Sequence, residues 1–109
     1  MDIRDLLKII ESFFGKKAKQ YMIESEKREI SCLLYDSFQF KCGFEGQYGN
    51  FNGGIIVGDS YVVTKFFGEF LSLNNDEESI IKSLEKVDQY CRLRLPDKFL
   101  NAYEEAYLT

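Results

Sequence analysis

Few side chains in this sequence could act as acids, bases or nucleophiles, and their spacing does not assemble a catalytic group. The 109 residues include no histidine, the side chain that most often performs acid–base catalysis near neutral pH. Two adjacent carboxylate pairs remain, Glu77-Glu78 and Glu104-Glu105. Neighbouring residues on a helix point about 100° apart, so neither pair converges on one substrate. We therefore expect no catalytic residue, and no enzyme activity.

Cysteine chemistry and metal binding are not expected either. Cys32, Cys42 and Cys91 are scattered, and no histidine is present to activate a thiolate. An odd number of cysteines without metal-binding spacing is typical of reduced, buried thiols. A Cys32–Cys42 bridge stays open, because both fall on neighbouring predicted strands. The oxygen-rich segment 74–78 lacks the alternating ligands and the central glycine of a calcium loop, so we expect no metal and no cofactor.

The most unusual stretch is residues 46–54, which hold four glycines and two asparagines. It matches neither glycine-rich nucleotide-binding pattern. One interpretation is a long hairpin loop whose glycines permit positive φ angles. The other is a recognition loop, in which Tyr48 is a rigid anchor and Gln47, Asn50 and Asn52 supply adaptable hydrogen bonds. Both interpretations remain open at this point.

The first half of the chain predicts a helix followed by an antiparallel sheet. Apolar residues recur at helical spacing from Ile3 to Phe14, and Gly15 is a suitable stop. Residues 16–28 are ambiguous between a short helix and a strand. Three strands then follow, with a tight turn at Asp36-Ser37, and they are predicted at Ile30–Tyr35, Phe38–Phe44 and Ile55–Val57.

The second half predicts mainly helices. Residues 60–73 pair apolar side chains every four positions, so we favour a helix there over a strand. A further helix opens at Asp76-Glu77-Glu78, acids that suit a helix N-terminus, and Pro96 fits the first turn of the last one. Eight phenylalanines fall on predicted buried faces: Phe13, Phe14, Phe38, Phe40, Phe44, Phe66, Phe67 and Phe70. The fold class is α+β: an N-terminal helix, a three-stranded antiparallel meander, and two or three C-terminal helices.

Composition describes one soluble domain over residues 1–109. Apolar residues make up 45% of the chain, enough for a core without disulfides or metal. No signal peptide or membrane-spanning run is visible, so we expect a cytoplasmic protein. The net charge of −4 arises entirely after residue 58, where ten acids face six bases. Such a surface disfavours nucleic acid and favours a basic partner.

This profile resembles the small acidic immunity proteins of bacterial contact-dependent growth inhibition systems. The likeness lies in the acid-rich stretch 59–78, the loop 46–54 and the acidic last helix. It implies a protein that binds a cognate toxin domain and occludes its basic active site, without a nucleic-acid or membrane partner, and that is a monomer when free. The expected partner-binding residues are Glu45, Tyr48, Asp59, Glu69, Asp76, Glu77 and Glu78.

Two other classes of function stay open. One is a secretion-type chaperone, also small, acidic and α+β, which would be a stable homodimer with apolar patches exposed for an unfolded client. The other is a domain that binds a small molecule, or acts on one through carboxylates or tyrosines, in an apolar cavity between sheet and helices.

Overall fold

The computed structural model describes residues 1–57, 61–71 and 74–108, and it begins with the predicted helix α1 (Ile3–Phe14). A capping box fixes its first turn, because Asp2 accepts hydrogen bonds from the backbone of Arg4 and Asp5 while Asp5 accepts one from Asp2. Gly15 ends the helix at a φ of 54°, a value that glycine adopts readily. A short 3₁₀ turn, η1 (Gly15–Lys17), leads into the sheet.

Five antiparallel strands follow one another as a meander, and neighbours in sequence are neighbours in the sheet. The strands are β1 (Ala18–Glu24), β2 (Glu29–Leu34), β3 (Phe38–Glu45), β4 (Asn50–Val57) and β5 (Tyr61–Val63). The prediction of an α+β fold is confirmed, but the sheet has five strands where three were predicted. The ambiguous segment 16–28 supplies β1, and the turn at Asp36-Ser37 is confirmed between β2 and β3.

The predicted long loop over 46–54 is wrong. The β3–β4 turn spans only residues 46–49, and β4 begins at Asn50 and includes Gly53 and Gly54. A Cβ atom at Gly54 would lie 2.7 Å from Val62 Cγ1 and 2.8 Å from the Val63 carbonyl oxygen. Glycine is needed there because β5 approaches the β4 backbone closely, so the composition that indicated a loop reflects strand packing.

The predicted helix over 60–73 is also wrong. Among the described residues of that range, β5 is followed by a small two-stranded sheet, β6 (Lys65–Phe66) and β7 (Glu69–Phe70). The turn between β6 and β7 has positive φ angles at Phe67 (57°) and Gly68 (81°), which no helix contains. Phe66 is buried as predicted, whereas Phe67 and Phe70 are 52% and 62% exposed, so their assignment to the core was incorrect.

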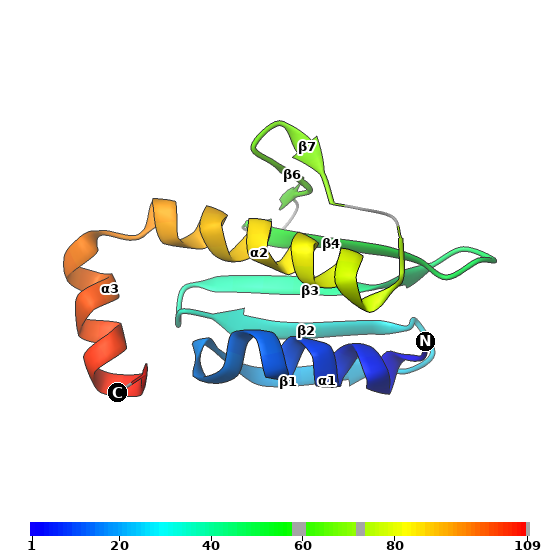
Figure 1. The fold of residues 1–109 in the computed structure, drawn as a ribbon, viewed down its shortest axis with the longest axis horizontal. Coiled ribbons are helices and arrows are strands. Elements are labelled where there is room, and N and C mark those ends of the chain that lie inside the picture. The colour runs from blue at the N-terminus through cyan, green and yellow to red at the C-terminus, as the bar shows by residue number, and fades with distance from the viewer. Residues whose placement is uncertain (58–60, 72–73, 109) are drawn as a thin grey trace.

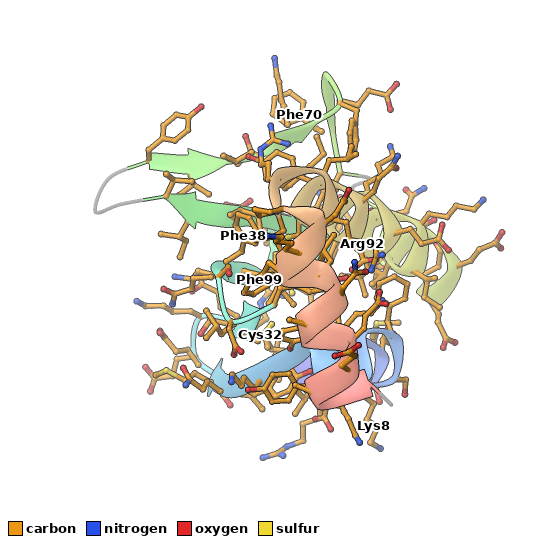
Figure 2. The ribbon with its side chains drawn as sticks, turned by 90° about the vertical axis from the view of Figure 1, so that its left-hand side faces the viewer. Lys8, Cys32, Phe38, Phe70, Arg92 and Phe99 are labelled. Atoms are coloured by element: carbon orange, nitrogen blue, oxygen red, sulfur yellow. The ribbon has the colours of Figure 1, made fainter. Side chains whose placement is uncertain are left out.

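Two C-terminal helices complete the chain: α2 (Glu77–Arg94) and α3 (Asp97–Tyr103), which continues as one π-helical turn, η2 (Glu104–Leu108). Helices α1 and α2 lie side by side over one face of the sheet (Figure 1). Viewed along the strands, the side chains of the opposite face project away from the helices (Figure 2). The described part of the chain therefore has a core on one side of the sheet and leaves the other side open.

The core between sheet and helices is apolar and includes all three cysteines. Cys32, Cys42 and Cys91 are buried and free, so the disulfide that the sequence left open is not formed. Burial raises the pKa of the Cys32 and Cys91 thiols to about 12, which keeps them protonated and unreactive. The largest fully buried side chains are Tyr35, Phe40, Phe51, Phe66, Leu6, Ile10, Ile30, Leu34, Ile55, Ile80, Leu84 and Val87.

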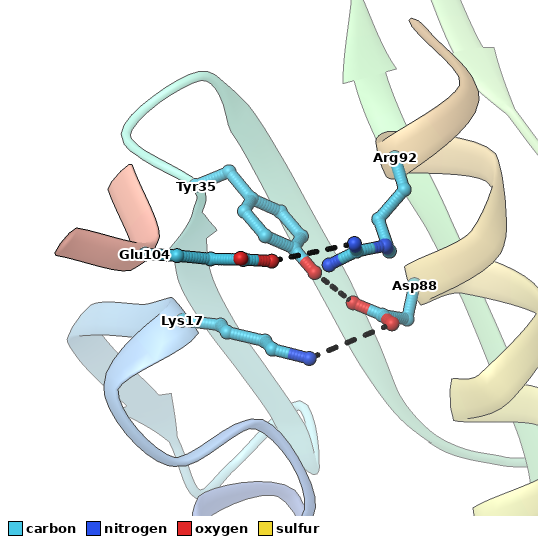
Figure 3. A network of polar contacts seen from close by, with 5 residues as sticks. All are labelled: Lys17, Tyr35, Asp88, Arg92 and Glu104. Atoms are coloured by element: carbon cyan, nitrogen blue, oxygen red, sulfur yellow. Dashed lines mark hydrogen bonds and ion pairs between the residues drawn. The ribbon is translucent and has the colours of Figure 1, made fainter. Parts of the chain in front are cut away.

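A half-buried polar network attaches the C-terminal segment to this core (Figure 3). The buried Tyr35 hydroxyl donates a hydrogen bond to Asp88 on α2, and burial together with this bond raises the pKa of Tyr35. Lys17 Nζ lies 3.8 Å from the same carboxylate. One turn further along α2, Arg92 lies 3.4 Å from Glu104 of η2. The network joins η1, α2 and η2, so its role in the structure is to position the last helix.

Candidate partner-binding surfaces

The β3–β4 turn is held from two sides. Asn75, just before α2, donates a hydrogen bond to the Gly49 carbonyl oxygen at 3.0 Å and a longer one to that of Tyr48 at 3.5 Å. Arg28, from the β1–β2 turn, donates to the Gly46 carbonyl oxygen at 3.0 Å. The Tyr48 side chain is nevertheless 79% exposed. A fixed backbone thus presents an aromatic ring to solvent.

Carboxylates surround this turn. Asp76 is the N-cap of α2 and accepts a hydrogen bond from the Ser79 backbone at 3.0 Å, which lowers the pKa of its carboxyl group. Glu77 and Glu78 follow in the first helical turn and are exposed, and Glu45 ends β3. Five of the predicted partner-binding residues therefore lie at one end of the molecule, and we call them the turn–helix surface: Glu45, Tyr48, Asp76, Glu77 and Glu78.

The other two predicted residues do not join this surface. Glu69 lies on β7 and pairs with Lys86 of α2 at 3.1 Å. Its ion partner places it on the face where β6 and β7 meet the helix, apart from the β3–β4 turn. Asp59 lies outside the described residues. The acid-rich stretch of the sequence is thus divided between two regions of the fold.

A second exposed surface was missed by sequence reasoning. Of the ten large hydrophobic side chains that are exposed among the described residues, five fall within residues 57–70. We call them the aromatic surface: Val57 (49% exposed), Tyr61 (65%), Val62 (47%), Phe67 (52%) and Phe70 (62%). The signal that could have revealed it is Gly68, which interrupts the apparent helical pattern at the centre of an aromatic run. Exposed apolar side chains are candidates for interaction sites, and within this set Val57 lies opposite Tyr61 in the sheet register.

The helix-free face of the sheet carries a shallow cavity of about 540 Å³ over β3, β4 and β5. Ile56, Tyr61 and Val62 form its apolar wall. Its polar groups already bind one another, since Lys41 Nζ lies 2.9 Å from Glu29 and Asn52 donates to Glu45 at 2.7 Å. The cavity therefore offers a ligand an apolar wall and few unpaired polar groups.

Comparison of the chain with models of known families, with curated proteins and with solved structures finds no match. Within the described residues, no helix combines the length and apolar character needed to cross a membrane. The same residues contain no group of three or more His, Cys, Asp or Glu side chains placed to hold a metal ion. The two exposed surfaces remain as the candidate binding sites of the described structure.

Proposed function

We propose that this protein is an immunity-type inhibitor, which binds a cognate toxin domain through the turn–helix surface and occludes its basic active site. The observation that carries the proposal is the exposed Tyr48 ring, held on a hydrogen-bonded turn beside the acids at the start of α2. An aromatic side chain on a fixed backbone loses little conformational entropy on binding, and such residues dominate protein interfaces.

The charge of this surface supports a basic partner. A helix N-terminus carries a partial positive charge of roughly +0.5. The three carboxylates of Asp76, Glu77 and Glu78 outweigh it, and Glu45 adds a fourth. Only Glu78 among these four has a cation within ion-pair distance in the described structure, Lys82 at 3.4 Å, and both side chains of that pair are largely exposed. The surface is therefore net negative and would steer a basic cleft toward it.

The test measures association of the purified chain with the candidate toxin domain, taken from the neighbouring gene, at increasing salt. The double variant Glu77→Lys/Glu78→Lys should lower the association rate about tenfold at low salt, because steering depends on these charges. The matched control is Glu11→Lys/Asp97→Lys, which changes the net charge equally at exposed sites away from the turn–helix surface. A rate that responds neither to salt nor to the Glu77/Glu78 reversal would refute the proposal.

A second candidate function, a secretion-type chaperone, is favoured by the aromatic surface, because exposed apolar side chains suit an unfolded client. The chaperone predicts that the chain slows aggregation of a chemically unfolded test protein. Loss of that effect in Tyr61→Ser/Phe70→Ser, but not in Tyr48→Ser, would assign client binding to the aromatic surface. An inhibitor of a folded toxin predicts the reverse: Tyr48→Ser weakens toxin binding and client aggregation is unaffected.

A further inference from the structure

We propose that the outer groove between α1 and α2 is a docking site for a basic amphipathic helix of another protein. The inference goes beyond the inhibitor function and does not depend on it, because a helix of this kind can belong to a partner of any activity. It rests on three observations: the continuity of the groove, its apolar floor, and the excess of unpaired acids along it.

The groove consists of three adjoining cavities of about 260, 340 and 400 Å³. Glu77 and Ile81 of α2 line the first two cavities, and Glu85 lines the last two. Phe13 lines the first and the third from α1, which lies beside α2 (Figure 1). Leu100 of α3 also lines the third, so α3 bounds the groove at the end of α2. The three cavities therefore form one continuous depression.

The α2 wall of the groove is a single row of side chains. Its members are spaced four residues apart along the helix: Glu77, Ile81, Glu85, Gln89 and Leu93. Residues four apart are neighbours on one side of a helix. From Glu77 to Leu93 the helix rises about 24 Å, which matches a partner helix of about four turns.

The floor of the groove is apolar and held in place by the core. The Phe13 ring meets that of Phe14 edge-to-face at 4.8 Å, and Phe14 is buried. Ile81 is half-buried, whereas Leu93 is 66% exposed. An apolar face laid in the groove would cover Phe13, Ile81 and Leu93, and removal of their exposed surface from water favours binding.

The charges along the groove favour a basic segment. The lining charges that already have an ion partner are Asp88 with Lys17, Lys82 with Glu78, and Arg92 with Glu104. No described cation lies within ion-pair distance of the other lining acids, Glu77, Glu85 and Asp97. Among the described residues, Lys8 is the one lining cation without an ion partner. The unpaired charge is therefore mainly negative, and lysine or arginine side chains complement it.

The walls of the groove determine that the occupant is a helix. Both walls are helices, α1 and α2, whose backbone groups are hydrogen-bonded within each helix. A partner strand would find no strand edge to pair with, and its own backbone groups would be left unpaired. A helix satisfies its own backbone and can present apolar side chains to Phe13 and Leu93 and basic ones to Glu77 and Glu85.

The probe is a fluorescent synthetic peptide of about 18 residues, made of leucine and lysine, with the leucines on one helical face. It is titrated with the full chain at about 0.15 M salt and binding is measured by fluorescence anisotropy. The wild-type chain should bind it. The double variant Glu85→Lys/Leu93→Ser should raise the dissociation constant at least about tenfold, because it reverses one charge and removes one apolar contact. Both side chains are exposed, so the variant should keep its fold.

The matched control is Glu11→Lys/Met22→Ser. It makes the same two kinds of change at sites outside the groove, where Glu11 is exposed and Met22 is 62% exposed. The control should bind the peptide as the wild-type chain does. Tyr48→Ser, on the turn–helix surface, should also leave peptide binding unchanged, so the result is separate from the outcome for the inhibitor function.

Two further peptides distinguish docking from attraction to the net charge of −4. A peptide of the same composition with its leucines scattered around the helix should bind at least about tenfold more weakly, and one with glutamate in place of lysine should not bind. The proposal is overturned if the wild-type chain does not bind the leucine–lysine peptide, or binds the scattered peptide equally well. Equal loss of affinity in the groove variant and in its control would also overturn it.

Discussion

The turn–helix surface and the aromatic surface are built in opposite ways. Tyr48 is presented by a turn whose carbonyl oxygens accept hydrogen bonds from Asn75 and Arg28. Phe67 and Phe70 are presented by a hairpin that is attached through one buried ring, Phe66, and one ion pair. The charged surface is thus anchored by hydrogen bonds, and the apolar surface mainly by a buried ring. Binding at the charged surface should depend on salt.

The largest effect should come from the apolar anchor. Phe66→Ala removes a fully buried ring and should lower the free energy of unfolding by about 3 kcal/mol, as large-to-small core substitutions do. Urea unfolding measures this change. Phe67→Ala, one residue along, removes a ring that is 52% exposed and should change it by less than about 1 kcal/mol. Equal losses in the two variants would show that the buried Phe66 ring does not anchor the hairpin more strongly than the exposed Phe67 ring.

The polar anchor should contribute less. Asn75→Ala removes the hydrogen bonds to the Gly49 and Tyr48 carbonyl oxygens, and the loss should be about 1 kcal/mol in urea unfolding. Amide hydrogen exchange should increase in residues 46–49, because the turn then loses its hydrogen bonds to Asn75 and keeps the one from Arg28. The hairpin of β6 and β7 serves as the internal control, since its exchange should not change. Faster exchange in both regions would indicate a general loss of stability and contradict the comparison.

The sequence analysis was correct for those elements in which the buried positions follow from local periodicity. The 3.6-residue repeat of α1 and the strict alternation of β3 depend on local periodicity, and both were correct. The segment 60–73 was assigned wrongly because Phe66, Phe67 and Phe70 have helical spacing but face in different directions in a hairpin. The deciding feature, positive φ at Phe67 and Gly68, is a property of the turn that the apolar pattern does not encode.

The candidate site was predicted in part for a similar reason. The acids at the start of α2 could be predicted from the preference of helix N-termini for acidic residues. Tyr48 could be picked out because it is an aromatic residue in a glycine-rich stretch. That the two lie together depends on Asn75 reaching across to Gly49, a contact between residues 26 positions apart. A local sequence pattern carries no information about a contact between residues so far apart in the sequence. The aromatic surface was missed because apolar residues are assigned to the core unless their exposure is known.

Relief of the strained turn should produce a smaller effect with the opposite sign. Phe67→Asn should raise the free energy of unfolding of the isolated chain by up to about 1 kcal/mol, because asparagine adopts the left-handed conformation at lower cost. The measurement is urea unfolding at a concentration low enough to exclude self-association. Glu26→Gln, an exposed polar substitution in the β1–β2 turn, is a control expected to change little. Destabilisation by Phe67→Asn would show that packing of the Phe67 ring within its own chain outweighs the strain of its backbone conformation.

The smallest effect should appear at the turn–helix surface as a dependence on pH. Backbone hydrogen bonding from Ser79 holds the pKa of Asp76 below its usual range. The pKa of an aspartate carboxyl group in the unfolded state is about 4. A group whose pKa is lower than this in the folded state stabilises the fold above about pH 4, and this contribution is lost as the pH falls through the folded-state pKa. Asp76→Asn keeps a capping side chain but cannot titrate, so its melting temperature should fall less than that of wild type between about pH 6 and about pH 3.

Asp2 is also a cap with a lowered pKa, held mainly by the backbone of Asp5. Asp2→Asn should show the same reduced acid sensitivity at α1, far from the turn, while leaving toxin association at neutral pH unchanged. Identical pH profiles for wild type and Asp76→Asn would mean that the carboxylate is not engaged with the helix, and that its charge is available to a partner in full.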